Sequence, residues 1–314
     1  MEKKSRSFSE KKILIIGGSG FIGSNLLKNL TSHGAELVSL SRVNKAPFPG
    51  ITHYNVDINQ YNQIDKFIKT NYDIIFHCAG YSDHLSFFKK PGEVIQNNLT
   101  GTLNILNSIK KNKAKSKLIL LGSKLEYGKP KYLPVDENHP TMPISAYSIE
   151  KLASTLFALN YYRLYKIPCV VLRISNVYGP HGNLSFKNYN VINSFIDRAK
   201  KKKDLIIYGD GKQLCDYIYI DDLVGALISV AISDETNGEI YNVGCGLPIV
   251  FKDFVKLIAR KAGVKNVYHR WPKWRLLTKV GSYYSDISKI SLDCSWFPKI
   301  SYERGIDLCL KHSD

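Results

Sequence analysis

Short apolar segments alternate with amphipathic stretches along the first half of the chain. The apolar segments predict strands at Lys12–Ile16, Glu36–Leu40, His53–Val56, Ile74–His77, Lys117–Leu121 and Cys169–Arg173. Between them, apolar positions recur with the helical period and predict helices at Phe21–Ser32, Tyr61–Lys69, Glu93–Lys110 and Ala146–Tyr165. Strands that alternate with helices in this way are typical of βαβ units. We therefore predict an α/β fold built on a doubly wound parallel sheet.

The regular alternation ends after Tyr178, where turns rich in glycine, proline and asparagine begin. Further on, the pattern predicts a helix, a strand, a helix and a strand, at Val191–Lys200, Leu205–Tyr208, Asp221–Ile232 and Glu239–Val243. The last two favour a return to the first domain. We expect a dinucleotide-binding domain made of residues 1–178 and about 216–243, and a smaller, discontinuous α/β lobe made of about 179–215 and 244–314.

Composition excludes several classes of protein. Apolar residues make up 44% of the 314 residues, but no apolar run approaches the roughly 20 residues of a membrane-spanning helix. The polar start of the chain, Met1–Lys12, lacks the apolar stretch of a secretory signal. We therefore expect a soluble, cytoplasmic protein with no membrane span. The 6 cysteines form no CxxC pair and have no histidine at metal-ligand spacing, so we expect reduced thiols and no metal site.

The chain is strongly basic, with a formal net charge of +17. Such a charge attracts nucleic acid, an anionic lipid surface or a phosphorylated small molecule alike. The densest run, Lys200–Lys203, follows a predicted helix, where cations favour the helix C-terminus and are usually solvated. Because no recognised nucleic-acid module accompanies the charge, we do not expect nucleic acid as a partner.

A glycine-rich turn follows the first predicted strand. Gly17, Gly20 and Gly23 recur at intervals of three, and Phe21 and Ile22 open the next helix. Glycine permits a tight turn, a close approach of the backbone to a pyrophosphate, and close packing of the helix on the strand. The helix N-terminus adds free N–H groups and the positive end of its dipole. We predict that this turn binds the phosphates of a dinucleotide.

Ser41 and Arg42 follow the second predicted strand. At this place, dinucleotide-binding folds often carry a carboxylate that binds the adenosine ribose and would repel a 2′-phosphate. A hydroxyl beside a guanidinium would instead bind a 2′-phosphate through charge-assisted hydrogen bonds. The sequence therefore favours NADP over NAD. In the alternative interpretation, Arg42 is a solvated surface charge and the cofactor is NAD.

Three side chains predict a catalytic group. The helix at Ala146–Tyr165 places Tyr147 and Lys151 four residues apart, on one face. A phenol with a pKa near 10 is a poor acid or base at neutral pH, but an adjacent cation lowers that pKa towards working range. Ser123 follows the strand at Lys117–Leu121, at the carboxyl edge where open α/β sheets bind their ligands. We expect its hydroxyl to donate to a substrate oxygen.

Several motifs in order resemble the extended short-chain dehydrogenase/reductase family, the sugar-nucleotide epimerases, dehydratases and reductases with a Rossmann domain. The glycine turn and the Ser123, Tyr147 and Lys151 group match the family's phosphate-binding and catalytic motifs. The resemblance implies further cofactor contacts at Asp57, Ile58, Cys78, Ala79, Gly80, Asn98 and Ile174. It implies substrate contacts at Lys124, Asn176, Asn190, Val191, Tyr208, Cys215 and Lys279.

Departures from the family pattern narrow the reaction. Lys124 and Leu125 replace the Asp-Glu pair that follows the catalytic hydroxyl in 4,6-dehydratases, and Leu125 also replaces the glutamate of the decarboxylases. In GDP-fucose synthase a cysteine and a histidine epimerise the sugar, whereas Leu125 and Asn190 stand there in this chain. These reactions are therefore disfavoured.

Cys215 replaces the arginine that in this family usually clamps the substrate diphosphate, and a thiol cannot replace a bidentate guanidinium. We expect Lys279 or Arg275 to supply the missing charge. The alternative is a substrate other than an ordinary nucleoside-diphosphate sugar.

The resemblance implies hydride transfer between NADP(H) and C4 of a nucleoside-diphosphate sugar. Reduction of a 4-keto sugar is the favoured reaction, and 4-epimerisation is the alternative. A dinucleotide-binding scaffold or redox sensor is the non-catalytic alternative, disfavoured by the intact catalytic group. The predicted helix that carries Tyr147 also presents Leu152, Leu156, Phe157 and Tyr161, which could pair in a homodimer as well as pack on the sheet.

Overall fold

The computed structural model describes residues 8–80, 91–180, 191–271 and 280–312. Within these residues, seven parallel strands form the central sheet in the order β11-β6-β5-β4-β1-β2-β3. They are β1 (Lys12–Ile16), β2 (Glu36–Ser41), β3 (Thr52–Asn55), β4 (Ile74–His77), β5 (Lys117–Ser123), β6 (Cys169–Ile174) and β11 (Glu239–Val243). The order reverses between β1 and β4, where open α/β sheets bind ligands beyond the carboxyl ends of the strands. The predicted doubly wound α/β fold is confirmed.

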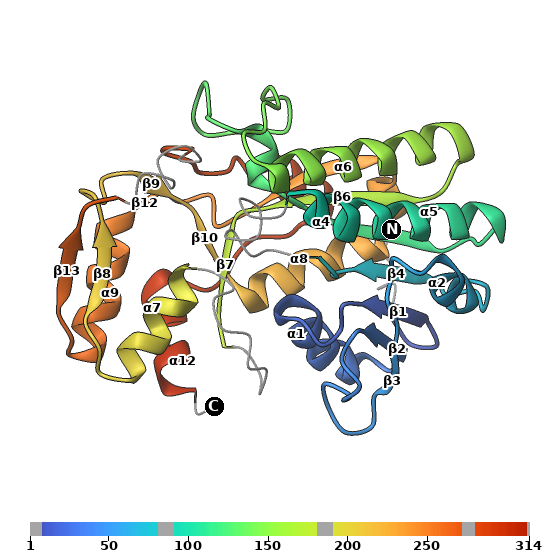
Figure 1. Ribbon diagram of the computed structural model, residues 1–314, viewed down its shortest axis with the longest axis horizontal. Coiled ribbons are helices and arrows are strands. Elements are labelled where there is room, and N and C mark those ends of the chain that lie inside the picture. The colour runs from blue at the N-terminus through green and yellow to red at the C-terminus, as the bar shows by residue number, and fades with distance from the viewer. Residues whose placement is uncertain (1–7, 81–90, 181–190, 272–279, 313–314) are drawn as a thin grey trace.

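Helices cover both faces of this sheet (Figure 1). On one face α1 (Phe21–Leu30) contacts α8 (Ile220–Ile232). The other face carries α2 (Tyr61–Ile68), α5 (Gly101–Lys111) and α6 (Ala146–Tyr165). Alternate residues of β1 belong to two separate apolar cores, Ile13 and Ile15 to one and Leu14 and Ile16 to the other. A strand buried on both faces has to be apolar throughout, which is why these strands stand out in the sequence.

The segment predicted as one helix at Glu93–Lys110 is interrupted. α4 (Pro91–Ile95) leads into a π-helical turn, η2 (Gln96–Thr100), and then into α5. The one-helix prediction was therefore incomplete. π turns inside helices often lie at functional sites, and this one holds Asn98, whose Nδ2 donates to Glu150 Oε2 at 2.9 Å. Short 3-10 turns also occur elsewhere in the chain, at η1 (Thr31–His33), η3 (Lys124–Tyr127) and η4 (Asp234–Thr236).

A smaller group of elements lies beside the sheet (Figure 1). α7 (Val191–Lys200), α9 (Phe251–Ala262) and α12 (Tyr302–Lys311) pack together against the parallel pair β8 (Leu205–Tyr208) and β13 (Asn266–His269). Two further pairs are short, β9 (Leu214–Cys215) with β12 (Ile249–Val250), and β7 (Asn176–Tyr178) with β10 (Tyr217–Tyr219). α11 (Ser288–Cys294) returns to contact β11.

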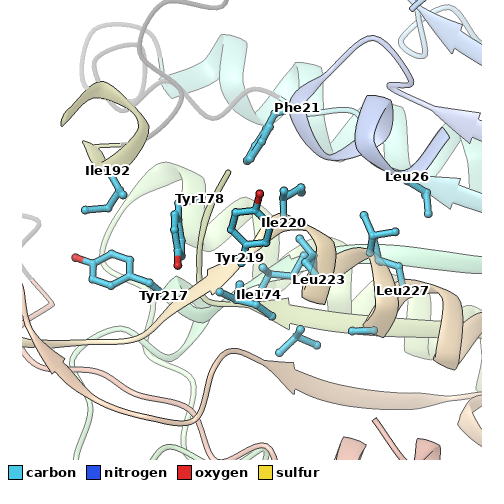
Figure 2. Packing of buried hydrophobic residues seen from close by; sticks show 14 of the residues in the cluster. Phe21, Leu26, Ile174, Tyr178, Ile192, Tyr217, Tyr219, Ile220, Leu223 and Leu227 are labelled. Carbon is cyan, nitrogen blue, oxygen red and sulfur yellow. The ribbon is translucent and has the colours of Figure 1, made fainter. Parts of the chain in front are cut away.

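One continuous apolar core joins the two groups of elements. Figure 2 shows Tyr178 and Tyr219 between Ile192 of α7 and Ile220 of α8, with Tyr217 below Ile192 and Tyr178 in this view. The Tyr178 ring meets the Tyr219 ring edge-on, with 5.6 Å between their centroids. Because β7 and β10 carry these rings, the short pair fixes the smaller group of elements against the carboxyl edge of the sheet.

Candidate active site

A cavity of about 400 Å³ lies at the carboxyl ends of the sheet strands. The described residues that line it include most of the predicted cofactor and catalytic residues, namely Gly17, Gly20, Phe21, Ile22, Ser41, Arg42, Asp57, Ile58, Cys78, Ala79, Gly80, Asn98, Ser123, Tyr147, Lys151 and Ile174. Of the predicted substrate residues, Lys124 and Asn176 line it as well. Residues spread over most of the sheet thus meet in one cavity.

The glycine turn has no room for side chains at two of its positions. Gly17 has a φ of 88°, and a Cβ there would lie 2.5 Å from the backbone nitrogen of Ala79. At Gly23 a Cβ would lie 2.3 Å from the carbonyl oxygen of Gly17, so α1 packs directly on the turn. Gly20 is the N-cap of α1, and no side chain caps this end of the helix. The first N–H groups of α1 can therefore bind an anion.

The end of β2 forms the polar wall at one side of the turn. Ser41 Oγ lies 2.9 Å from Ser19 Oγ and accepts a hydrogen bond from the Val43 backbone nitrogen at 3.1 Å. The Arg42 side chain is exposed at this wall. Asp57 is the one carboxylate among the described lining residues, and its Oδ1 accepts from the backbone nitrogen of Asn59 at 3.0 Å.

Ser123 is fixed by a buried charge network that the sequence analysis missed. Its backbone nitrogen donates to Glu126 Oε1 at 2.8 Å, and its Oγ accepts from the Leu125 nitrogen at 3.2 Å. Glu126 Oε2 accepts from Arg173 Nε at 2.8 Å and from Thr155 Oγ1 at 3.1 Å. The Glu126 and Arg173 side chains are 0% and 4% exposed, so this ion pair is almost entirely removed from water.

Tyr147 and Lys151 lie on the face of α6 that borders the cavity. The Lys151 ammonium is 5.8 Å from the centre of the Tyr147 ring and donates to the carbonyl oxygen of Leu121 at 3.0 Å. Glu150, between them in sequence, is 1% exposed and accepts from Asn98 Nδ2 and, at 3.0 Å, from Ser154 Oγ. The π turn at Asn98 is thus anchored to α6, the helix that carries both predicted catalytic residues.

The pKa of Tyr147 departs from the expected direction. Burial raises the pKa of the phenol, and the lowering effects of the Lys151 cation and of a hydrogen bond with Ser123 are smaller, so the pKa is raised overall. The prediction of a lowered pKa was wrong because it counted the cation and not the desolvation. For Lys151, burial lowers the pKa, but Glu150 and Tyr147 raise it by more, and the amine stays protonated.

Lys124 extends the site from Ser123 towards the smaller group of elements. Its ammonium lies 4.9 Å from the centre of the Tyr283 ring. Burial lowers the pKa of this amine, and the neighbouring Cys215 and Asp216 oppose the shift. The Asp216 carboxylate is fully buried and accepts from the backbone nitrogens of Cys245 at 2.7 Å and Ser285 at 3.0 Å.

The remaining predicted substrate residues are not among the described residues that line the cavity. Val191 is 47% exposed at the start of α7. The Tyr208 ring, at the end of β8, lies 5.9 Å from the Trp271 ring. Cys215 is partly buried in β9. Asn190, Arg275 and Lys279 lie outside the described residues.

Two predicted absences concern the described part of the chain alone. Among those residues, no group of three or more histidine, cysteine, aspartate or glutamate side chains is arranged to hold a metal ion. Within the same ranges no helix combines the length and the apolar character that crossing a membrane requires.

Comparison with known proteins identifies the class. The sequence matches the NAD dependent epimerase/dehydratase family over residues 13–244. It is 30% identical over 304 residues to a Methanocaldococcus jannaschii protein named "Putative UDP-glucose 4-epimerase", covering 94% of this chain and 95% of the relative. It is 29% identical to a UDP-N-acetyl-alpha-D-glucosaminuronate decarboxylase of Bacillus cytotoxicus, covering 95% of this chain and 96% of the relative.

A crystal structure of UDP-glucose 4-epimerase from Thermotoga maritima with UDP-glucose superposes with a TM-score of 0.88 at 26% identity, covering 96% of this chain and 97% of that one. The chain therefore belongs to the NAD-dependent epimerase/dehydratase family. It is an enzyme of the extended short-chain dehydrogenase/reductase type, as its motifs predicted.

Proposed function

We propose that this enzyme transfers hydride at C4 of a nucleoside-diphosphate sugar and that its net reaction is 4-epimerisation. The observation that carries the proposal is the meeting of Ser123, Tyr147 and Lys151 in the cavity that also contains the glycine turn. The glycine turn and the end of β2 would hold a nicotinamide dinucleotide, and the chemistry supplied by that group when bound is reversible hydride exchange with C4. The cofactor would occupy the dinucleotide-binding domain, residues 1–178 and about 216–243, and the nucleotide sugar would extend into the smaller lobe.

Each catalytic side chain has a role that its surroundings support. Tyr147 would take the proton of the C4 hydroxyl and give it back to the oxygen of the 4-keto sugar. Ser123, held by Glu126, would donate a hydrogen bond to that oxygen. Lys151 would bind the nicotinamide ribose and keep a positive charge beside the phenol. In an epimerase the 4-keto sugar rotates within the site, so that hydride returns to the opposite face of C4.

We propose that the cofactor is NADP. At the end of β2 the cavity is lined by Ser41, Arg42 and Val43, and Asp57 is the one carboxylate among its described lining residues. A guanidinium and a hydroxyl suit a 2′-phosphate better than a ribose diol. Calorimetry should give a lower Kd for NADPH than for NADH, and Arg42→Ala should narrow the gap. Lys45→Ala, an exposed cation nearby, is the control. Equal affinities in the parent enzyme would support NAD instead.

Two reactions of the same machinery compete, and each has an observation in its favour. Two of the three similar proteins named above are called UDP-glucose 4-epimerases, and this supports epimerisation. The end of β2 contributes Ser41 and Arg42 to the cavity and no carboxylate, which favours NADP. NADP suits a reductase, because a reductase exchanges its cofactor at each turnover. The position of Lys124 and Leu125 after Ser123 argues against the elimination of water across C5 and C6 that a 4,6-dehydratase performs, because the usual acid and base are replaced.

One assay separates the two reactions. The enzyme is incubated with NADP⁺ or NAD⁺ and, in turn, UDP-glucose, UDP-N-acetylglucosamine and UDP-glucuronate. Epimerisation yields the C4 epimer by NMR with no net change in absorbance at the nicotinamide band. Reduction instead appears as NADPH consumption when a 4-keto sugar nucleotide is supplied. Absence of both the C4 epimer with the three UDP sugars and NADPH consumption with the 4-keto sugar nucleotide would refute hydride transfer at C4.

We also propose a homodimer through α6. Its outer face leaves apolar residues exposed at intervals of seven or eight positions, with Ile149 51%, Leu156 56% and Leu164 56% exposed. Such a stripe on a long helix is typical of helix pairing between subunits. Light scattering should show a dimer that Leu156→Glu dissociates. Leu292→Glu, at an 81% exposed leucine of α11, should leave the dimer intact. A monomeric parent protein would contradict the proposal.

A further inference from the structure

Lys124 is a cation without a hydrogen-bonding partner in the described structure. It lines the cavity directly beside Ser123, and its ammonium lies 4.9 Å from the centre of the Tyr283 ring. Within the described residues, neither an ion pair nor a hydrogen bond joins its ammonium to a carboxylate. A partly buried ammonium with no acceptor costs free energy, so an anionic ligand at this place would be bound strongly.

The nearest acid does not meet this need. Asp216 influences the pKa of Lys124, but among the described residues no hydrogen bond or ion pair joins the two groups; its Oδ1 accepts from the Cys245 nitrogen and its Oδ2 from the Ser285 nitrogen. Asp216, between β9 and β10 in sequence, therefore holds the segments around Cys245 and Ser285 together. The amine remains directed to the cavity.

Lys124 also reaches the position where a charge is missing. The Tyr283 backbone nitrogen donates to the Leu214 carbonyl at 3.0 Å, so the ring that Lys124 contacts belongs to the segment paired beside Cys215. The Lys124 cation and the Cys215 thiol influence each other's pKa values. Position 215 therefore holds a cysteine where the family pattern predicts an arginine. Lys124, which follows Ser123, approaches the same place through its contact with Tyr283.

We propose that Lys124 is a specificity-determining residue that binds an anionic oxygen of the substrate. This inference rests on the proposed function, because the substrate in question is the nucleoside-diphosphate sugar. The chemistry fits two oxyanions of that molecule, the diphosphate, which Cys215 cannot clamp, and a carboxylate on the sugar ring near Ser123. Both would accept a charge-assisted hydrogen bond from the amine.

Calorimetry with the cofactor-loaded enzyme tests the role of Lys124. The Kd values of UDP, UDP-glucose and UDP-glucuronate are compared for the parent enzyme, Lys124→Met, Lys124→Arg and the control Lys129→Met at an exposed lysine. Loss of the amine should weaken at least one ligand by roughly tenfold or more, the scale of a charged hydrogen bond. Lys124→Arg should restore part of the loss. An unchanged Kd for NADPH in Lys124→Met shows that the variant is folded.

The pattern across ligands identifies the oxyanion. A similar loss for all three ligands supports the diphosphate, whereas a loss confined to UDP-glucuronate supports a sugar carboxylate. Unchanged Kd values for all three overturn the inference, even if the parent enzyme turns them over normally. Failure of the proposed function would appear in the parent enzyme itself, as binding without turnover, and leaves the comparison of Kd values intact. A parent enzyme that binds none of the three refutes both.

Discussion

Removing the Glu126 carboxylate should destabilise the enzyme strongly. Glu126→Ala leaves the Arg173 guanidinium, 4% exposed, without its ion-pair partner at 2.8 Å. Breaking a buried ion pair by removing one partner costs about 3–5 kcal/mol, because the remaining charge cannot be hydrated. The Ser123 nitrogen and the Thr155 hydroxyl lose their acceptor as well. We expect a loss of at least about 3 kcal/mol in the free energy of unfolding.

Urea denaturation followed by fluorescence measures this loss, with Glu239→Ala as the matched control. Glu239 also forms an ion pair, with Lys289 at 2.6 Å, but its side chain is 44% exposed. Exposed pairs contribute about 0–1 kcal/mol, so the control should change little. The double variant Glu126→Leu/Arg173→Met should recover much of the stability, because apolar groups of similar volume can replace a buried pair. A loss below about 1 kcal/mol in Glu126→Ala would refute the reasoning.

Three further outcomes are expected. Tyr147→Phe should keep cofactor affinity and reduce kcat by about two orders of magnitude or more, as measured by turnover with the best substrate. Gly23→Ala should weaken NADPH binding in calorimetry, because its Cβ would lie 2.3 Å from the Gly17 carbonyl oxygen; an unchanged Kd would contradict a role of the glycine turn in binding the cofactor. Hydrogen bonds, first from Ser108, lower the pKa of Asp65 to about 2 from 3.8, so its contribution to stability is present above about pH 4 and lost towards pH 2. Denaturation of Asp65→Asn and the parent protein should therefore differ at pH 7 and converge near pH 2.

Most of the central sheet could be predicted because its inner strands are buried on both faces; the edge strand β3 is largely exposed. β1, β4, α6, α7, β8 and β11 begin and end where the apolar pattern places them. The short strands could not be found in this way. β9 and β12 have two residues each, β7 and β10 three, and a period of two needs more positions than that to be visible. The π turn at Asn98 also depends on a distant residue, Glu150, and has no local pattern.

The glycine turn and the end of β2 could be predicted because glycine spacing and strand ends act locally, whereas Asp57, Ile58, Cys78, Ala79, Gly80, Asn98 and Ile174 were implied by the family resemblance. The residues beneath the cavity could not be predicted. Glu126 and Arg173 are 47 positions apart, and in the sequence each of them taken alone would be interpreted as a solvated charge. One signal was available, since Arg173 directly continues the apolar run of β6, where a charge has to find a buried partner. The surroundings of the Lys124 ammonium likewise depend on the segment around Tyr283, which returns to β9. No local sequence pattern predicts that contact.

The burial of Tyr147 and Lys151 affects their protonation states. These states bear on the direction of the proposed reaction. Burial raises the pKa of Tyr147 beyond what the Lys151 cation can offset, so the phenol holds its proton at neutral pH. Lys151 holds its charge, because Glu150 and Tyr147 outweigh its own desolvation. A protonated tyrosine beside a fixed cation is ready to protonate the oxygen of a 4-keto sugar. Removing a proton from a C4 hydroxyl requires the phenolate, which needs further positive charge near the ring. A cation bound with the substrate or cofactor would therefore matter more for oxidation at C4 than for reduction, and the first half of the proposed epimerisation would be the more demanding half.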